Sequence, residues 1–308
     1  MREATMRAAV YARYGSPDVV RIEDVAKPAP GDDEILVRVR ATTVTAGDSR
    51  LRRADPFLAR IFNGLLRPKK VTILGFELAG VVDAVGKDVQ RFRPGDEVFA
   101  FTGFGFGGHA DYCCLRMHGK IFDVGLVSLK PGNLSFEQAA AMPVGALTAR
   151  AFLRLAGLRS GERILVHGAS GSVGTYAVQL AKQIGANVTA VCSGPNAALV
   201  ESLGADAVID YTTRDFTAEG PVFDVVFDAA GKCKSSLGKR ALKKGGRFVS
   251  VMGSAKFEAD DLDELAKLAQ AGKLTAVIDR TYPLEDIVEA HRYVDAGHKK
   301  GNVVVTVA

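Results

Sequence analysis

Hydrophobic positions in the first third of the chain recur with the period of β-strands. Residues 34–44 show this best, because Ile35, Val37 and Val39 stand at every second position, as in a strand with one buried face. The pattern therefore predicts a strand over 34–44. Similar runs predict further strands at 6–11, 19–25, 78–85, 96–101 and 109–115.

The pattern becomes helical near residue 135. Ser135 and Gln138 have the spacing of a capping box, in which two side chains satisfy backbone amides at the start of a helix. We expect a short helix that runs towards Met142 and is broken by Pro143. A second helix is predicted from about residue 146 to Gly157, which stands where a helix should end.

A strand, a glycine-rich turn and a helix follow at 163–185. Residues 164–166 are an apolar run, and Gly168, Gly171 and Gly174 come after it at three-residue spacing. Such a turn presents free backbone amides to a phosphate at the start of a helix. Gly168 would allow the tight turn, Gly171 the close approach of a pyrophosphate, and Gly174 the packing of helix on strand. An ordinary strand-to-helix turn is the alternative.

Further strands are predicted at helix-sized intervals, which is typical of a parallel sheet with crossover helices. They lie at 187–192, 207–210, 223–230 and 246–252. After them we expect a helix at 260–271, a strand at 276–279, a helix from Pro283 and a strand at 302–307. The predicted class is α/β, with a doubly wound parallel sheet in a dinucleotide-binding domain at 131–272. Residues 1–130 and 273–308 are predicted to fold together as a discontinuous β-rich domain.

The loop after the second strand of this sheet favours NADP(H). An NAD site places an acid there to bind the ribose hydroxyls, whereas here Cys192 is followed by Ser193, Gly194, Pro195 and Asn196. Ser193 and Asn196 can donate hydrogen bonds to a 2′-phosphate. They could instead serve only as turn and helix-cap residues. The loop has no cation of its own, so Lys182, Arg214 and Lys232 are candidates to supply a positive charge.

Composition and charge narrow the class of protein. The chain has 308 residues, enough for two domains, and a formal charge of +5 spread along its length. We therefore expect neither nucleic-acid nor membrane binding. No apolar run reaches about 18 residues, and residues 1–7 contain no apolar signal core, so we expect a cytoplasmic protein. The four cysteines do not form a disulfide framework.

Several stretches together resemble the medium-chain dehydrogenase/reductase superfamily, in its zinc-independent quinone oxidoreductase branch. They are Gly75-Phe76-Glu77-Leu78-Ala79-Gly80, Arg93-Pro94-Gly95-Asp96, Gly145-Ala146-Leu147-Thr148-Ala149, the turn at 168–174, Leu203-Gly204-Ala205-Asp206 and the tail at 290–304. Within that branch the chain is most similar to alkenal and enone reductases and to the chloroplast-envelope quinone oxidoreductase homologues. The resemblance implies a GroES-like catalytic domain beside a Rossmann domain, with the active site in the cleft between them.

The resemblance also implies a set of NADP(H)-binding residues. Thr148 should approach the nicotinamide phosphate, Met252 and Gly253 the nicotinamide, and Asn302 lies in a tail that commonly reaches the cofactor. The others are Gly168, Ser170, Gly171, Ser172, Val173 and Gly174 at the pyrophosphate, Ser193, Asn196 and Tyr211 at the 2′-phosphate, and Ala230 and Gly231 under the adenine ribose. For Tyr211, Met252 and Asn302, a surface turn, core packing and a turn are the respective alternatives.

The residues at the metal position separate this chain from the zinc alcohol dehydrogenases. In those relatives a His precedes the Glu of the Gly-x-Glu motif and a Cys lies in the segment equivalent to 43–48. Here Phe76 and Thr43-Val44-Thr45-Ala46-Gly47-Asp48 stand in those places. A catalytic zinc needs three protein ligands, so we predict no metal. Thr45 and Asp48 are candidates to position the substrate, and the alternative is that Asp48 simply caps a helical turn.

Without a metal, hydride must pass to an acceptor that is already electron-poor. The sequence therefore predicts an NADPH-dependent reductase of a quinone or an α,β-unsaturated carbonyl, both small molecules. The alternative is an NADPH-binding protein with little or no catalysis, such as a crystallin-like or redox-sensing protein. The oligomeric state stays open, because the segment 253–259 is shorter than in relatives, where it carries an edge strand that often pairs across a dimer. That strand is either absent or reduced to a stub at 255–258.

Overall fold

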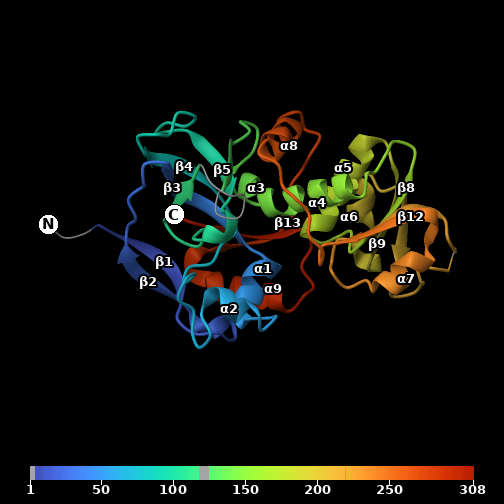
Figure 1. Cartoon of the computed structure of the whole chain (residues 1–308), viewed down its shortest axis with the longest axis horizontal. Coiled ribbons are helices and arrows are strands. Elements are labelled where there is room, and N and C mark those ends of the chain that lie inside the picture. The colour runs from blue at the N-terminus through green and yellow to red at the C-terminus, as the bar shows by residue number, and fades with distance from the viewer. Residues whose placement is uncertain (1–3, 118–124, 219) are drawn as a thin grey trace. The chain divides into compact units, whose positions relative to one another are not determined.

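The computed structural model describes residues 4–117, 125–218 and 220–308 (Figure 1). The chain divides into two compact units, Met1–Pro143 with Ile278–Ala308, and Val144–Val277. We call them the first and the second unit. The domain boundaries expected after residues 130 and 272 stay a prediction, because compactness does not tell which segments fold together on their own.

The first unit is built on antiparallel strands. β1 (Thr5–Tyr11) pairs with β2 (Val20–Ala26) in a separate ribbon. A seven-stranded sheet has β3 (Glu34–Val44) near its centre, with the bounds that the sequence predicts. In order along the sheet come β13 (Ile278–Pro283), β14 (Asn302–Thr306), β3, β4 (Glu77–Val85), β5 (Glu97–Phe101) and β7 (Leu126–Leu129), and β6 (Tyr112–Arg116) also pairs with β3.

Short helices accompany this sheet. They are α1 (Ala46–Arg53), α2 (Ala59–Asn63), α3 (Phe136–Ala140) and α9 (Ile287–Asp295), with 3-10 turns at Pro17–Val19, Gly103–Gly105 and Leu284–Asp286. α3 begins at the predicted capping box of Ser135 and Gln138. The expectation of a helix from Pro283 and a strand at 276–279 was wrong in its bounds, because the edge strand β13 continues to Pro283 and a 3-10 turn precedes α9.

The second unit contains a five-stranded sheet in which all described pairings are parallel. The strand order is β10 (Ala207–Asp210), β9 (Asn187–Cys192), β8 (Arg163–His167), β11 (Phe223–Asp228) and β12 (Leu242–Ser250). Its helices are α4 (Pro143–Leu155), α5 (Ser172–Ile184), α6 (Ala197–Ser202), α7 (Ser235–Arg240) and α8 (Asp261–Gln270), with a 3-10 turn at Gly194–Asn196. α5 packs on β8 and β9, and α7 packs on β12 (Figure 1). The predicted α/β class with a doubly wound parallel sheet is confirmed.

The sheet of the second unit ends at β12. Residues 251–260, all of which the structure describes, contain no strand, so the reduced strand considered at 255–258 is not formed. An open sheet edge invites pairing with another chain unless charges blunt it, and β12 carries Lys243, Lys244 and Arg247. Of the two alternatives that the sequence left open, an absent or a shortened edge strand, the described residues show the first.

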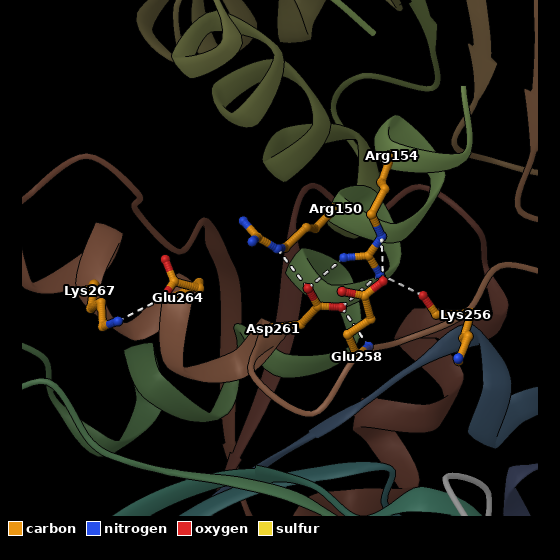
Figure 2. A network of polar contacts seen from close by, with 7 residues as sticks. All are labelled: Arg150, Arg154, Lys256, Glu258, Asp261, Glu264 and Lys267. Atoms are coloured by element: carbon orange, nitrogen blue, oxygen red, sulfur yellow. Dashed lines mark hydrogen bonds and ion pairs between the residues drawn. The ribbon is translucent and has the colours of Figure 1, made fainter. Parts of the chain in front are cut away.

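Ion pairs join α8 to α4 beyond this edge. The buried Asp261 carboxylate accepts hydrogen bonds from Arg150 Nε and Arg154 Nη1, both at 2.8 Å, and from the Glu258 amide at 2.8 Å (Figure 2). Burial alone would raise the pKa of Asp261, but these donors outweigh it and hold the pKa below its ordinary value. The network anchors the short connection from β12 to α8.

Candidate active site

Glycines shape the turn between β8 and α5. Gly168 has a φ of +77°, and a Cβ at Gly174 would lie 2.2 Å from the Gly168 carbonyl oxygen. Gly171 is the N-cap of α5 and supplies no side-chain cap. Because the first amides of an α-helix have no intrahelical acceptor, this turn can hold an anion without competition from a capping side chain. The residues present therefore fit a dinucleotide pyrophosphate.

Thr148 belongs to α4, whose first turn lies against the start of α5. A Cβ at Gly145 would come within 2.6 Å of Ser172 Oγ and within 2.8 Å of the Tyr176 ring. Thr148 is one helical turn further along α4 and is half-buried. α4 and α5 are thus in contact at Gly145 and Ser172, and Thr148 lies one turn along α4 from this contact.

Asp228, at the end of β11, contacts side chains at the ends of β8 and β12. The sequence analysis did not single it out. Its carboxylate lies 3.2 Å from His167 Nδ1 and accepts a hydrogen bond from Ser250 Oγ at 2.9 Å. It also accepts from the backbone amides of Ala230 and Lys232. Burial would raise the pKa of Asp228, but these bonds hold it below its ordinary value.

The loop that Asp228 holds contains further predicted residues. A Cβ at Gly168 would lie 2.6 Å from Ala230 Cβ, and one at Gly231 would lie 3.0 Å from Met252 Sδ. Met252 is 61% exposed, which rules out core packing as its role. Gly253 follows it and donates its amide to the Ser250 carbonyl at 2.8 Å. Gly168, Ala230, Gly231, Met252 and Gly253 therefore gather at the carboxyl ends of β8, β11 and β12.

The loop after β9 presents two neutral polar side chains, Ser193 and Asn196. The Asn196 amide Nδ2 donates to Ser193 Oγ at 3.1 Å and to Ser170 Oγ at 3.2 Å. Asn196 thereby joins the loop to the glycine turn. Tyr211 begins the next loop, with its amide on the Cys192 carbonyl and its ring 59% exposed. Ser170, Ser193, Asn196 and Tyr211 are thus close to one another in the second unit.

An acidic side chain also reaches this loop, which the sequence analysis did not foresee. β9 and β10 pair Cys192 with Asp210, and a Cβ at Gly194 would lie 2.6 Å from Asp210 Oδ2. Thr212 donates both its amide and its hydroxyl to Asp210 Oδ1 and lowers the pKa of the carboxyl. Lys182 is engaged elsewhere, at 2.8 Å from both oxygens of Asp206. Arg214, whose amide bonds the Asp210 carbonyl, is the candidate cation near this loop.

In the first unit, Thr45 and Asp48 form the capping box of α1. Asp48 Oδ2 accepts from the Thr45 amide at 2.8 Å and from Thr45 Oγ1 at 2.6 Å, and Asp48 Oδ1 accepts from the Gly75 amide at 2.8 Å. The Asp48 side chain is fully buried. The helix begins at Ala46 with Thr45 as its N-cap, so Asp48 is not the cap residue itself but the third residue of the helix, which completes the capping box. Both Asp48 oxygens have donors, and its observed contacts are structural.

Phe76 lies directly on α1. A Cβ at Gly47 would come within 2.6 Å of the Phe76 ring, so ring and helix are in van der Waals contact. A metal at this position would need nitrogen, sulfur or free carboxylate donors. Phe76 offers none, and the Asp48 carboxylate is already bonded to Thr45 and Gly75. Within the described residues no group of three His, Cys, Asp or Glu side chains could hold a metal ion. A catalytic zinc therefore does not fit here.

Asn302 begins β14 in the same unit. Val303 pairs with Val44, so the Asn302 backbone lies beside Thr45 at the end of β3, and its side chain is buried. Lys299 nearby is a titratable group that the sequence did not single out. Burial lowers its pKa to about 8, although Glu77 and Asp279 partly oppose this shift. Nothing in Lys-Lys-Gly-Asn signals that burial, because it depends on residues distant in sequence, among them Glu77 and Asp279.

No helix in the described part of the chain is long and apolar enough to cross a membrane. The four cysteines are free thiols, and burial raises the pKa of Cys113 to about 12. Cys113 is therefore a structural thiol rather than a nucleophile.

Family models match most of the chain. An alcohol dehydrogenase GroES-like domain model matches residues 31–148, and two zinc-binding dehydrogenase models match residues 172–267 and 253–305. The chain is 35% identical to 2-methylene-furan-3-one reductase of Solanum lycopersicum, over 97% of this chain and 79% of that protein. It is 32% identical, with the same coverage, to the chloroplastic NADPH-dependent alkenal/one oxidoreductase of Arabidopsis thaliana. The solved structure of the quinone oxidoreductase from Coxiella burnetii is similar with a TM-score of 0.85 and 29% identity, over 99% of this chain and all of that one.

Proposed function

This chain belongs to the medium-chain dehydrogenase/reductase superfamily, and we propose that it is an NADPH-dependent reductase of quinones or α,β-unsaturated carbonyls. The superfamily expected from the sequence is thereby confirmed. When bound, NADPH supplies the hydride that these acceptors take up. The protein's part is to bind, orient and shield the two reactants.

The second unit would hold the cofactor. The glycine turn at 168–174 and the start of α5 would bind the pyrophosphate, with Ser170, Ser172 and Val173 around it. Ser193, Asn196 and Tyr211 would bind the 2′-phosphate. Thr148, Ala230, Gly231, Met252 and Gly253 would line the rest of the dinucleotide. Asp228 positions the loop of Ala230 and Gly231 without touching the cofactor itself.

The first unit would offer the acceptor an apolar surface at Phe76, beside Thr45. Asp48 would act as a positioning residue for this surface, because its carboxylate ties α1 to the Gly75 amide. We assign no proton donor to Asp48, since Thr45 and Gly75 already donate to both of its oxygens.

The observation that carries the proposal is the chemistry of the donor set around Phe76. An aromatic ring and a fully bonded carboxylate can neither polarise an alcohol nor ligate a metal. The acceptor must then be electron-poor before it binds. Quinones and α,β-unsaturated carbonyls meet this requirement, whereas simple ketones and alcohols do not.

The test follows NADPH absorbance in two directions: oxidation of NADPH by benzoquinone, 2-hexenal or cyclohexanone, and formation of NADPH from NADP⁺ with ethanol. We expect turnover with the first two only, and the same rate after dialysis against a chelator. Turnover of ethanol, or loss of activity after chelation, would contradict the proposal. Tight NADPH binding without turnover of any acceptor would favour the alternative of a binding protein.

We also propose that the protein works in a reducing compartment such as the cytoplasm. The four cysteines are free, and burial raises the pKa of Cys114, Cys192 and Cys233 to about 11. Cell fractionation with an antibody against the untagged protein tests this proposal. Recovery within an organelle would contradict the cytoplasmic assignment.

A further inference from the structure

An exposed apolar surface stands out in the first unit, around α2. Six exposed apolar side chains lie within the ten residues 57–66, and we call these six residues the apolar segment. Their side chains are exposed to 63, 68, 72, 38, 61 and 88% in Phe57, Leu58, Ile61, Phe62, Leu65 and Leu66, respectively. A monomeric protein rarely leaves so many large apolar side chains together in water unless they bind something.

The backbone beneath the apolar segment is firmly anchored. Asn63 is fully buried, and its amide Nδ2 donates to the Tyr11 hydroxyl at 2.7 Å and to the Val71 carbonyl at 3.1 Å. Asn63 Oδ1 accepts from the Val71 amide at 2.6 Å. The Tyr14 hydroxyl donates to the Gly64 carbonyl at 2.7 Å. These bonds hold α2 from its inner side, so the outward apolar side chains form a built surface.

A row of aromatic rings joins this surface to the acceptor position. The Phe76 and Phe106 ring centroids are 4.3 Å apart, those of Phe106 and Phe104 6.3 Å, and those of Phe104 and Phe62 6.0 Å. Phe106 has a φ of +56°, an unfavourable conformation for a bulky residue. Such strain persists where the surroundings impose it, often at binding sites. The strained backbone at Phe106 thus holds its ring between those of Phe76 and Phe104.

We propose that the ring row and the apolar segment bind the hydrocarbon tail of the acceptor. The preferred substrates are then long-chain 2-alkenals or quinones with an alkyl or prenyl tail, rather than small acceptors. This inference rests on the proposed function, which places the electron-poor group beside Phe76. The buried Phe106 ring would support Phe76 and Phe104 from beneath, and the tail would extend from Phe76 over Phe104 to Phe62 and the leucines at 65 and 66.

The charges around the apolar segment are compatible with an uncharged hydrocarbon tail. The charged side chains between residues 54 and 70 are Asp55, Arg60, Arg67, Lys69 and Lys70. Lys70 Nζ lies 4.3 Å from the centroid of the Phe62 ring. Arg60 lies over the rings of Tyr14 and Phe57, at 4.9 and 5.2 Å from their centroids. Two cations at this surface, Arg60 and Lys70, are therefore already engaged with aromatic faces.

The test compares kcat/KM for acrolein, 2-hexenal and 2-nonenal. A fully buried methylene is worth up to about fourfold in binding, and a half-covered one about twofold. For the wild-type chain we expect 2-nonenal to exceed acrolein in kcat/KM by at least about tenfold, most of it through KM. The double variant Leu65→Ser/Leu66→Ser should lower that ratio by about fivefold or more. Both leucines are exposed, so the variant should fold, and thermal unfolding checks this.

Leu129→Ser is the matched control, because Leu129 is 55% exposed in the same unit but lies on β7, outside the apolar segment. It should keep the wild-type ratio. A wild-type ratio near one, or an equal loss of kcat/KM for all three aldehydes in the double variant, overturns the inference. A second result also overturns it: the double variant keeps the wild-type ratio of kcat/KM for 2-nonenal and acrolein but no longer sediments with phosphatidylglycerol vesicles, as the wild type does. That result would assign the surface to a lipid bilayer. Absence of NADPH oxidation with every acceptor instead overturns the proposed function.

Discussion

Replacing Ser193 by Asp should turn the cofactor preference from NADPH towards NADH. Ser193 Oγ accepts from Asn196 Nδ2 at 3.1 Å, in a loop without a carboxylate of its own. An Asp at this position keeps an acceptor for Asn196 but adds a negative charge where we place the 2′-phosphate. The same charge would accept a hydrogen bond from the ribose hydroxyl of NADH.

The magnitude follows from Coulomb's law. Two unit charges about 4 Å apart repel by about 1 kcal/mol in water and about 4 kcal/mol at an effective dielectric of about 20. Ser193 is half-buried, and a phosphate carries nearly two charges, so we expect roughly 2–4 kcal/mol against NADPH. This corresponds to a Kd about 30- to 1,000-fold higher. NADH should gain about 1 kcal/mol from the new hydrogen bond, or about fivefold.

The assay is a titration of both nucleotides, followed by the change in cofactor fluorescence. Ser193→Ala is the matched control, since it removes the hydroxyl without adding charge. It should weaken the binding of NADPH by about fivefold and leave the affinity for NADH unchanged. Asp210→Asn removes the negative charge beside Gly194 and should therefore lower the Kd for NADPH modestly. If Ser193→Asp leaves the NADPH Kd within twofold of the wild type, the 2′-phosphate does not lie at this loop.

Four further substitutions, one of them a control, test individual contacts. Asp48→Asn puts an amide among donors from Thr45 and Gly75, so we expect a loss of about 2–3 kcal/mol in the free energy of unfolding by urea. Asp261→Asn should cost about as much because Arg150 and Arg154 lose a buried partner, whereas Glu264→Gln, in an exposed pair, should change stability by less than about 0.5 kcal/mol. Burial, with His109 and Arg52 nearby, lowers the pKa of His291. The native state therefore resists a proton that the unfolded chain takes up below about pH 6.5, and wild-type stability should fall with pH there more steeply than that of His291→Leu.

The parallel sheet was predictable because its signals are local. The strands at 187–192 and 207–210 have the bounds that the sequence predicts, since each is a short apolar run between polar or glycine residues. Gly185 ends α5 in the left-handed conformation, as expected of a glycine there. The short helix α2 was missed because its apolar residues face solvent and give no amphipathic pattern.

The glycine turn and the loop after β9 could be located from sequence, but what surrounds them could not. Asp210 reaches Gly194 only because β9 and β10 pair Cys192 with Asp210, 18 residues apart. Asp228 gathers donors from His167 and Ser250 on two neighbouring strands. Contacts of this kind depend on strand order, which a linear pattern does not contain.

Two of the buried carboxylates, Asp48 and Asp228, serve the same purpose in the two units. Asp48 accepts from the Gly75 amide just before β4, and Asp228 accepts from the Ala230 amide just after β11, so each fixes a glycine-containing loop next to a strand. A buried carboxylate used in this way is fully bonded and no longer available for acid–base chemistry. The surfaces next to these loops are then backbone amides at Gly168–Gly174 and aromatic rings at Phe76. Such groups bind and orient reactants, which suits a hydride transfer whose chemistry resides in the cofactor and in an already activated acceptor.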